Sequence, residues 1–321
     1  MSWMKDLKRR VRLPFEWMGV GLGLLIFPNL THKGLFRVCD FISRVMYFFD
    51  GRGKRRSLAN LRLIFSGGDG VPSASYRPTK REEKIIRRSY RNMARTVGHA
   101  FWTCRQAAKR VRAVGETDAE TRAFLSANHP AITVSAHLGC WEILSQLAFL
   151  EGHRMMSVAK PIGTAGMTRL LMRARRSIGQ EIVPAEGALK PLMQGLRDGK
   201  SLGLLVDQVV KPKQGGVWVR FFGRPHPVSA APAFFAAKNK LPIIVAWSRP
   251  LVGGRFRCEC IATISSEEAR DVWGTTQRIL TLLEGTIRRH PSCWLLNYNC
   301  FRRRPTEAEL TQLVERESKT R

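Results

Sequence analysis

The second half of the chain alternates short apolar runs with stretches of helical periodicity, and this alternation limits the possible folds more than any other feature. It begins near Phe124 and continues to Arg289. Such a pattern is typical of an α/β domain, in which helices cover the faces of a sheet. It predicts strands at 131–135, 155–159, 202–206, 217–222, 243–247 and 256–264, and helices near 141–151, 164–178, 187–198, 230–239 and 267–289.

Residues 34–115 are basic and follow a helical pattern, interrupted by a loop over 66–78. Thr79 and Glu82 have the spacing of a capping box, and apolar residues then recur at helical intervals. This predicts one long amphipathic helix. Its polar face is either solvated or in contact with lipid, and it carries Lys80, Arg81, Lys84, Arg87, Arg88, Arg91 and Arg95.

The N-terminus combines several cations with the apolar run Trp17–Phe27, which Pro28 closes. Eleven residues are fewer than the roughly 20 that a spanning helix needs, and no small-x-small cleavage site follows. We expect residues 1–33 to be a membrane anchor at the interface, with a buried core helix as the alternative. The expected organisation continues with a basic helical region (34–115) packed on a mixed-sheet α/β domain (116–301), and ends in a charged tail (302–321).

The charge of the chain points to anionic partners. There are 54 Lys and Arg residues against 25 Asp and Glu, a net charge of +29. Such a protein attracts nucleic acid, anionic lipid head groups or an acidic carrier protein. No zinc finger, RNA-recognition motif or aromatic-interleaved basic repeat is present, so no specific nucleic acid is expected. A non-catalytic basic protein that binds lipid or nucleic acid remains the alternative from another class. The seven scattered cysteines indicate reduced thiols in a cytosolic environment.

The segment ITVSAHLGCWEILSQ (132–146) carries the candidate chemistry, and it predicts a strand, a turn at 137–139 and a helix from about Cys140. Glu142 then lies in the first helical turn and can face His137. A carboxylate that accepts a hydrogen bond from one ring nitrogen strengthens the other nitrogen as a base, as acyl transfer to a hydroxyl requires. A structural histidine is the alternative to a catalytic His137. Cys140 beside it is a candidate nucleophile for an acyl-enzyme mechanism. No G-x-S-x-G elbow is present.

His137 and Glu142 match the H-x4-D/E motif of the glycerolipid acyltransferase superfamily. Over most of its length the chain resembles the bacterial lipid A biosynthesis acyltransferases, the late lauroyl and myristoyl transferases. The ordered matches are SLANLRLIF (57–65), KP (160–161), RARRSIG (173–179), DQ (207–208), FFGRPHP (221–227) and W-x6-F-R-R-R-P (294–305).

This resemblance implies roles for individual residues. His137 is expected to be the general base and Glu142 its orienting partner, in a direct transfer that needs neither an acyl-enzyme nor a metal or cofactor. Asp207 is expected to be a supporting polar residue near the site. Independently of the resemblance, the remaining histidines have no comparable acid at short range and are expected to be structural, with a position of His226 near the mouth of the site as the alternative. The phosphate groups of a substrate are expected to bind Lys160 and one of Arg173, Arg175 and Arg176.

The resemblance also implies the substrates. The donor is an acyl thioester of acyl carrier protein or of coenzyme A, and the acceptor is a hydroxyl of an anionic, lipid A-type glycolipid at the cytoplasmic face of the inner membrane. The chain departs from the family pattern at Cys140, where Asn is usual, and at Lys160, where Arg is usual. The segment WLLNYNCFRRRP (294–305) also lacks the usual His and Arg pair. A glycerolipid, an aminolipid and a phosphatidylinositol mannoside-like glycolipid remain alternative acceptors.

Overall fold

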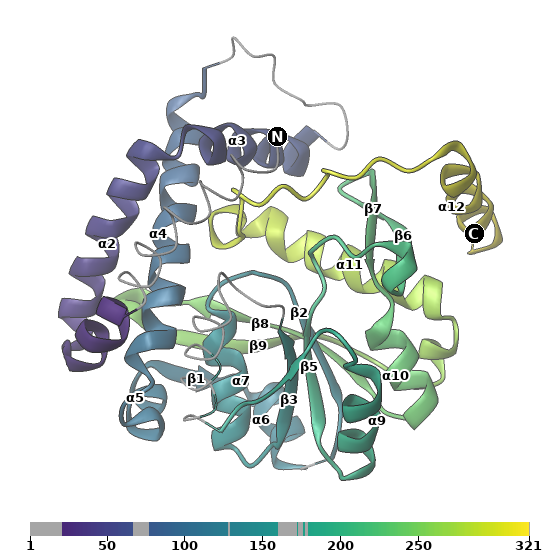
Figure 1. The fold of residues 1–321 in the computed structure, drawn as a ribbon, viewed down its shortest axis with the longest axis horizontal. Coiled ribbons are helices and arrows are strands. Elements are labelled where there is room, and N and C mark those ends of the chain that lie inside the picture. The colour runs from purple at the N-terminus through teal and green to yellow at the C-terminus, as the bar shows by residue number, and fades with distance from the viewer. Residues whose placement is uncertain are drawn as a thin grey trace, which may run out of the picture.

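The protein folds around a mixed seven-stranded sheet, shown in the computed structural model of Figure 1. The structure describes residues 21–66, 77–127, 129–159, 172, 176 and 179–320. The strand order is β1-β9-β8-β2-β5-β3-β4, and β6 with β7 forms a separate hairpin. Only the pair β8–β9 is antiparallel in the large sheet. The predicted α/β fold with a mixed sheet is confirmed.

The strands are β1 (Gly115–Thr117), β2 (Ile132–Ser135), β3 (Met155–Ala159), β4 (Glu181–Pro184), β5 (Ser201–Leu205), β6 (Gly216–Phe221), β7 (Arg224–Ser229), β8 (Ile243–Pro250) and β9 (Phe256–Ile264). The helices are α2 (His32–Phe49), α3 (Gly51–Ser66), α4 (Lys80–Trp102), α5 (Ala107–Val114), α6 (Ala119–Ser126), α7 (Trp141–Leu150), α9 (Leu189–Arg197), α10 (Ala231–Asn239), α11 (Val272–Arg289) and α12 (Glu307–Thr320).

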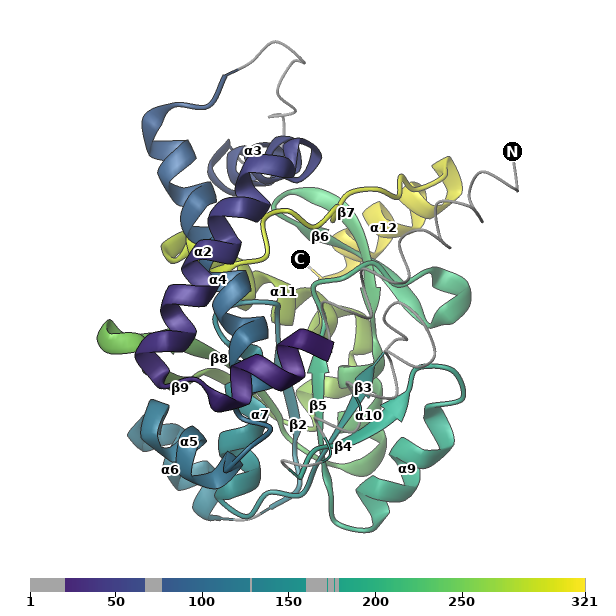
Figure 2. The same cartoon turned by 60° about the vertical axis from the view of Figure 1, so that its left-hand side comes forward.

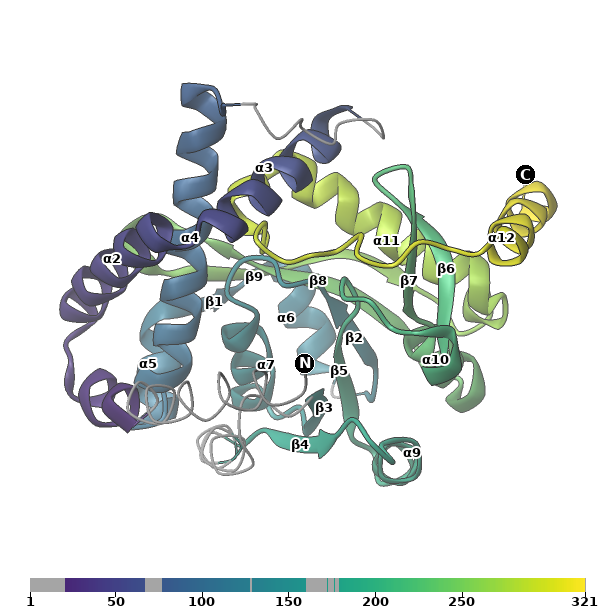
Figure 3. The ribbon, with the colours of Figure 1, turned by 45° about the horizontal axis from the view of Figure 1, so that its top comes forward.

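Helices cover both faces of the sheet. Figure 3 shows α11 on one side and α6 and α7 on the other. The central strands read as nearly continuous apolar runs because both of their faces are buried. Ile132, Val134, Leu202, Ile243 and Val245 are all fully buried in the main core. This core fixes β2 between β8 and β5, with Ser135 opposite Leu205 in the register of the parallel pair.

The N-terminal helices form a layer at one end of the sheet. Helix α4 begins with the predicted capping box, in which Thr79 and Glu82 satisfy each other's backbone N–H groups. It packs between α2 and the sheet domain (Figure 2). Arg95 forms a two-pronged ion pair with Asp40 of α2, at 2.8 and 2.9 Å. Val97 is one of the apolar residues that recur at helical intervals in α4, yet it is 47% exposed.

The sequence pattern missed three strands. Some of the predicted elements also fall on residues outside the described ranges. Strands β1 and β4 are only three and four residues long, and β7 contains two prolines, which usually argue against a strand. The predicted helix at 164–178 lies outside the described residues apart from 172 and 176, and so do residues 1–20 of the expected anchor. Within the described ranges, no helix is both long and apolar enough to cross a membrane.

The β6–β7 hairpin turns through two residues with positive φ, Phe222 (50°) and Gly223 (77°). Turns of this kind match the twist of the strands but usually use Asn-Gly, because a bulky residue is strained at positive φ. Phe222 is fully buried, and the carboxylate of Glu284 on α11 accepts its N–H at 2.7 Å. Burial of the ring and this hydrogen bond together stabilise the turn.

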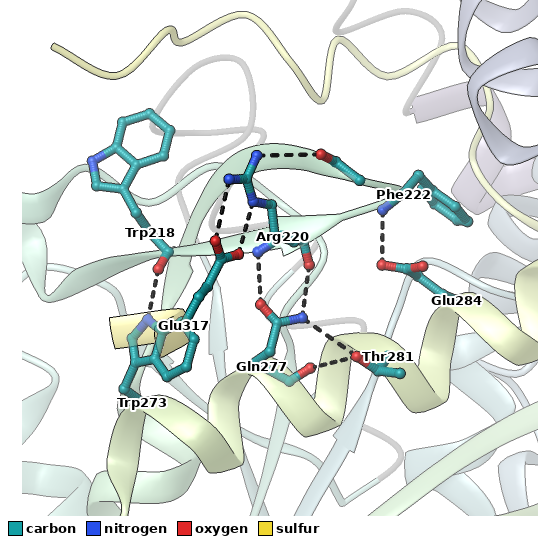
Figure 4. Close-up of polar contacts among 9 residues, drawn as sticks. Trp218, Arg220, Phe222, Trp273, Gln277, Thr281, Glu284 and Glu317 are labelled. Carbon is teal, nitrogen blue, oxygen red and sulfur yellow. Dashed lines mark hydrogen bonds and ion pairs between the residues drawn. The ribbon is translucent and has the colours of Figure 1, made fainter. Parts of the chain in front are cut away.

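Helix α11 also holds the hairpin through side chains that reach its main chain (Figure 4). Gln277 accepts the N–H of Arg220 at 2.7 Å and donates to the carbonyl of Arg220 at 3.0 Å. The indole N–H of Trp273 donates to the carbonyl of Trp218 at 2.8 Å. The side chain of Arg220 forms an ion pair with Glu317 of α12 at 2.8 Å, which attaches the C-terminal helix to the hairpin.

Replacing Gln277 with Ala is expected to lower the free energy of unfolding by about 1–3 kcal/mol, because both hydrogen bonds to the main chain of Arg220 are lost. Urea denaturation measures the effect. The control is Gln194→Ala, which removes an exposed side chain that donates to Asp198 four residues later in the chain. Equal stability of the Gln277 and Gln194 variants would contradict this account of hairpin attachment.

Candidate active site

His137 lies in a turn that is locked on both sides. Leu138 bridges to Trp294 and Gly139 bridges to Ser248 of β8. Gly139 has a φ of +64°, and a Cβ at this position would overlap the carbonyl oxygen of Ser248. The N–H of Leu295 donates to the carbonyl of His137 at 3.1 Å. The HLG sequence therefore requires its glycine, and the turn presents the imidazole in one place.

Asp207 is the acid that contacts His137. Each residue follows the end of a parallel strand by two positions, and β2 and β5 are neighbours in register. The carboxyl ends of parallel strands meet at one edge of a sheet, where α/β proteins bind their ligands. Nδ1 of His137 lies 2.7 Å from Oδ1 of Asp207, and the backbone N–H of His137 donates to Oδ2 at 3.0 Å.

The Asp207 carboxylate is buried and yet stabilised in its ionised form. Burial by itself raises the pKa of this carboxyl. The charge of His137 and the hydrogen bonds from His137 and Trp294 outweigh burial, so the pKa of Asp207 is below its ordinary value. The indole Nε1–H of Trp294 donates to Oδ2 at 2.9 Å, and Trp294 is itself buried. Asp207 is therefore a fixed negative charge behind the imidazole.

The other ring nitrogen of His137 faces the side chain of Gln208, with 3.2 Å between His137 Nε2 and Gln208 Nε2. The tautomer with its proton on Nδ1 satisfies both contacts, since Nδ1–H donates to Asp207 and Nε2 accepts from the amide. The ring of Trp141 lies edge-on to the imidazole, with 5.0 Å between centroids. In this tautomer Nε2 carries the free electron pair that a general base needs.

The predicted site residues have different outcomes. Glu142 lies in the first turn of α7, as expected, and is 7% exposed. The carboxylate at Nδ1 of His137 nevertheless belongs to Asp207, so the orienting contact expected of Glu142 is made by a different acid, and the role of Glu142 stays a prediction. Arg176 is exposed. Lys160, Arg173 and Arg175 lie outside the described residues.

Cys140 is a poor candidate nucleophile in this structure. It is fully buried at the start of α7, and burial raises the pKa of its thiol to about 12. The thiolate is the reactive form of cysteine, and at neutral pH almost none of it exists at such a pKa. The position next to His137 in the sequence therefore does not give Cys140 a reactive environment.

His226 is fully buried behind Asp207, so it is structural, and the alternative position near the mouth of the site is wrong. Its Nε2 lies 3.3 Å from the backbone oxygen of Asp207, and burial lowers its pKa to about 4. A neutral His226 donates to this carbonyl. It therefore supports the loop that carries Asp207 and does not face the substrate.

Polar side chains on α3 and α4 hold the loops of the site through their backbone carbonyls, and sequence reasoning missed this layer. In the sequence these polar residues stand among apolar residues of the helices. A buried polar group without a hydrogen bond is costly, so their positions could have predicted buried hydrogen-bond partners. Asn60 donates to the carbonyls of Leu296 and Tyr298 at 2.8 Å each, Ser89 to Trp294 at 2.7 Å, Asn92 to Ser292 at 2.8 Å and Thr96 to Gly139 at 3.1 Å.

Comparison with known proteins identifies the family. A search of curated proteins found no match. A family model described as bacterial lipid A biosynthesis acyltransferase matches residues 4–303, which is nearly the whole chain. The match includes the turn that carries His137 and the loop that carries Asp207. The protein belongs to the bacterial lipid A biosynthesis acyltransferase family and is an acyltransferase.

Proposed function

We propose that this acyltransferase moves a fatty acyl group from a thioester to a hydroxyl of a lipid A-type glycolipid, with His137 as the general base. The observation that carries the proposal is the 2.7 Å contact between Nδ1 of His137 and the buried carboxylate of Asp207. This contact fixes the tautomer of the ring and leaves the electron pair of Nε2 free to accept a proton. The family assignment supplies the reaction class.

The reaction is a direct acyl transfer. Nε2 of His137 takes the proton of the acceptor hydroxyl as the oxygen attacks the thioester carbonyl, and a tetrahedral oxyanion forms. When this intermediate collapses, the carbon–sulfur bond breaks and the proton on Nε2 passes to the departing thiolate. The products are an ester and a free thiol, and His137 returns to its starting tautomer. Asp207 stabilises the imidazolium while it exists.

Two neighbouring residues have supporting roles in this proposal. The amide of Gln208 occupies the position at Nε2 that the acceptor hydroxyl must take, so it withdraws when the acceptor binds. Glu142 is the second acid of the motif. A carboxylate is favoured in the first turn of a helix, and its charge adds to the stabilisation of the protonated His137.

The proposed substrates are both anionic. The donor is an acyl thioester of acyl carrier protein or of coenzyme A, and the acceptor is a phosphorylated glycolipid. The net charge of +29 favours encounter with either. Lys160 with one of Arg173, Arg175 and Arg176 is proposed to bind phosphate groups of a substrate. No metal or cofactor has a part in this scheme.

We propose that the enzyme works on the cytoplasmic face of the inner membrane and contacts the bilayer through α2. Phe41, Phe48 and Phe49 are 66, 74 and 78% exposed and lie close to one helical face. Exposed Arg37 and Arg44 lie on the same helix. Exposed aromatic rings beside arginines suit an anionic lipid surface, where the rings insert between head groups and the guanidinium groups pair with phosphates.

His137→Ala is expected to lower kcat for acyl transfer by about 10²- to 10⁴-fold, and Asp207→Asn and Glu142→Gln by a smaller part of the same range, because each removes a group that supports proton transfer. Transfer from acyl carrier protein thioester to lipid A precursor in detergent measures the rate. His129→Ala, on an exposed histidine, is the control. Full activity of a folded His137→Ala protein would disprove the assignment of the base.

Cys140→Ala is expected to retain activity within about twofold, because the thiol is buried and protonated at neutral pH. The same transfer assay measures the rate, and mass spectrometry of the protein after mixing with donor alone looks for a bound acyl group. A covalent acyl adduct that disappears in Cys140→Ala would replace direct transfer with an acyl-enzyme mechanism.

Replacing Phe41, Phe48 and Phe49 together with Ser is expected to weaken binding to phosphatidylglycerol vesicles at least about tenfold, since burying one phenylalanine contributes about 1.5–3 kcal/mol. Vesicle sedimentation measures the partition coefficient. The matched control replaces three exposed apolar residues elsewhere, Leu189, Leu310 and Val314, with Ser. Equal weakening in both triple variants would remove α2 as the membrane contact.

A further inference from the structure

A basic cavity lies beside the active site, between α3, the start of β7 and the segment that precedes α12. It has a volume of about 320 Å³. Figure 1 shows α3, the turn of the hairpin and this segment at the same end of the molecule. The polar part of the lining includes Arg56, Asn60, Arg224, Tyr298, Arg303 and Arg304.

The cavity carries an excess of positive charge. Four of its lining residues are arginines, and none of the described lining residues is acidic. Arg303 forms an ion pair with Glu309 at 3.1 Å, but its Nε is buried and has no hydrogen-bond partner among the residues that the structure describes. Arg56 and Arg304 are exposed. Several arginines that line one cavity can form a site for a phosphate group, which guanidinium groups bind through paired N–H donors.

The apolar lining residues and the volume of the cavity restrict the class of ligand further. Leu63, Pro225, Phe301 and Pro305 supply apolar walls. Small-molecule sites commonly measure about 300–1,000 Å³, so this cavity is large enough for a phosphorylated sugar or a similar head group and too small for a whole lipid. A phosphorylated sugar fits this cavity, with its phosphate against the arginines and its ring against the apolar walls.

The cavity shares a wall with the catalytic residues. The ring of Phe301 lies 5.4 Å from that of His226, and Nε2 of His226 lies 3.3 Å from the backbone oxygen of Asp207. On the other side, Asn60 holds the carbonyls of Leu296 and Tyr298, while the N–H of Leu295 donates to His137. A ligand in this cavity therefore sits against the segment that positions the catalytic pair.

We infer that this cavity binds a phosphate group of one of the enzyme's two substrates, an inference that rests on the proposed acyl transfer. Two sources have the required chemistry. One is a phosphate on the sugar head group of the acceptor lipid, and the other is the phosphate of the pantetheine arm that carries the donor thioester. Arg224 and Arg304 are the side chains chosen for substitution, because Arg304 is exposed and Arg224 is partly exposed, so neither belongs to the buried core.

The first test measures binding without catalysis. Glucose 1-phosphate and glucose are titrated into the full-length detergent-solubilised protein by calorimetry. The wild type is expected to bind the phosphorylated sugar and not glucose, and Arg224→Gln/Arg304→Gln to bind it at least about tenfold more weakly. Arg122→Gln/Arg270→Gln loses the same charge at exposed positions away from the cavity and is expected to match the wild type. Absence of binding to the wild type, or equal loss in both double variants, overturns the inference.

The second test identifies the source by steady-state transfer. A raised KM for the acceptor in Arg224→Gln/Arg304→Gln, with the KM for the donor unchanged, assigns the cavity to the lipid head group. A raised KM for the donor alone assigns it to the pantetheine phosphate. Unchanged KM values for both substrates overturn the substrate role. If neither the wild type nor any variant transfers an acyl group, the proposed reaction is wrong. The calorimetric result still shows whether the cavity binds a phosphate group.

Discussion

The structure depends on one buried charge, the carboxylate of Asp207. Removing an ion from water is costly unless its hydrogen bonds are replaced, and here three donors from two other segments replace them. The backbone and ring of His137 come from the loop after β2, and the indole of Trp294 comes from the segment after α11. The same carboxylate therefore joins these segments and prepares the imidazole for catalysis, so stability and function have a common origin.

The helical N-terminal part belongs to the active site although it carries no reacting group. Asn60, Ser89 and Thr96 direct their side chains at main-chain carbonyls of the two loops that meet at His137. Buried amide and hydroxyl groups need such partners, so the helices and loops fix each other's positions. Basic helical regions are easily regarded as membrane attachments only. In this protein the inner face of that layer holds the catalytic loops, while its outer face presents exposed phenylalanines.

Sequence patterns predicted the elements well and their contacts poorly. Apolar runs identified β2, β5, β8 and β9, because strands buried on both faces have a distinctive composition. Strand β7 was missed since its two prolines are tolerated only where the ladder leaves them unpaired. The acid next to His137 was sought five residues away at Glu142, yet it lies 70 residues away at Asp207. The contact between His137 and Asp207 depends on the order of the strands in the sheet, and this order cannot be read from a single sequence.

The contacts between α3, α4 and the C-terminal segment span more than 200 residues of sequence, from Ser89 to Trp294 and from Asn60 to Tyr298. Contacts this distant form late in folding, because the entropy of closing so large a loop must be met first. During synthesis the first helices emerge long before their partners exist. The catalytic turn consequently takes its final shape only after nearly the whole chain has left the ribosome, so a shortened chain retains the motif but not its arrangement.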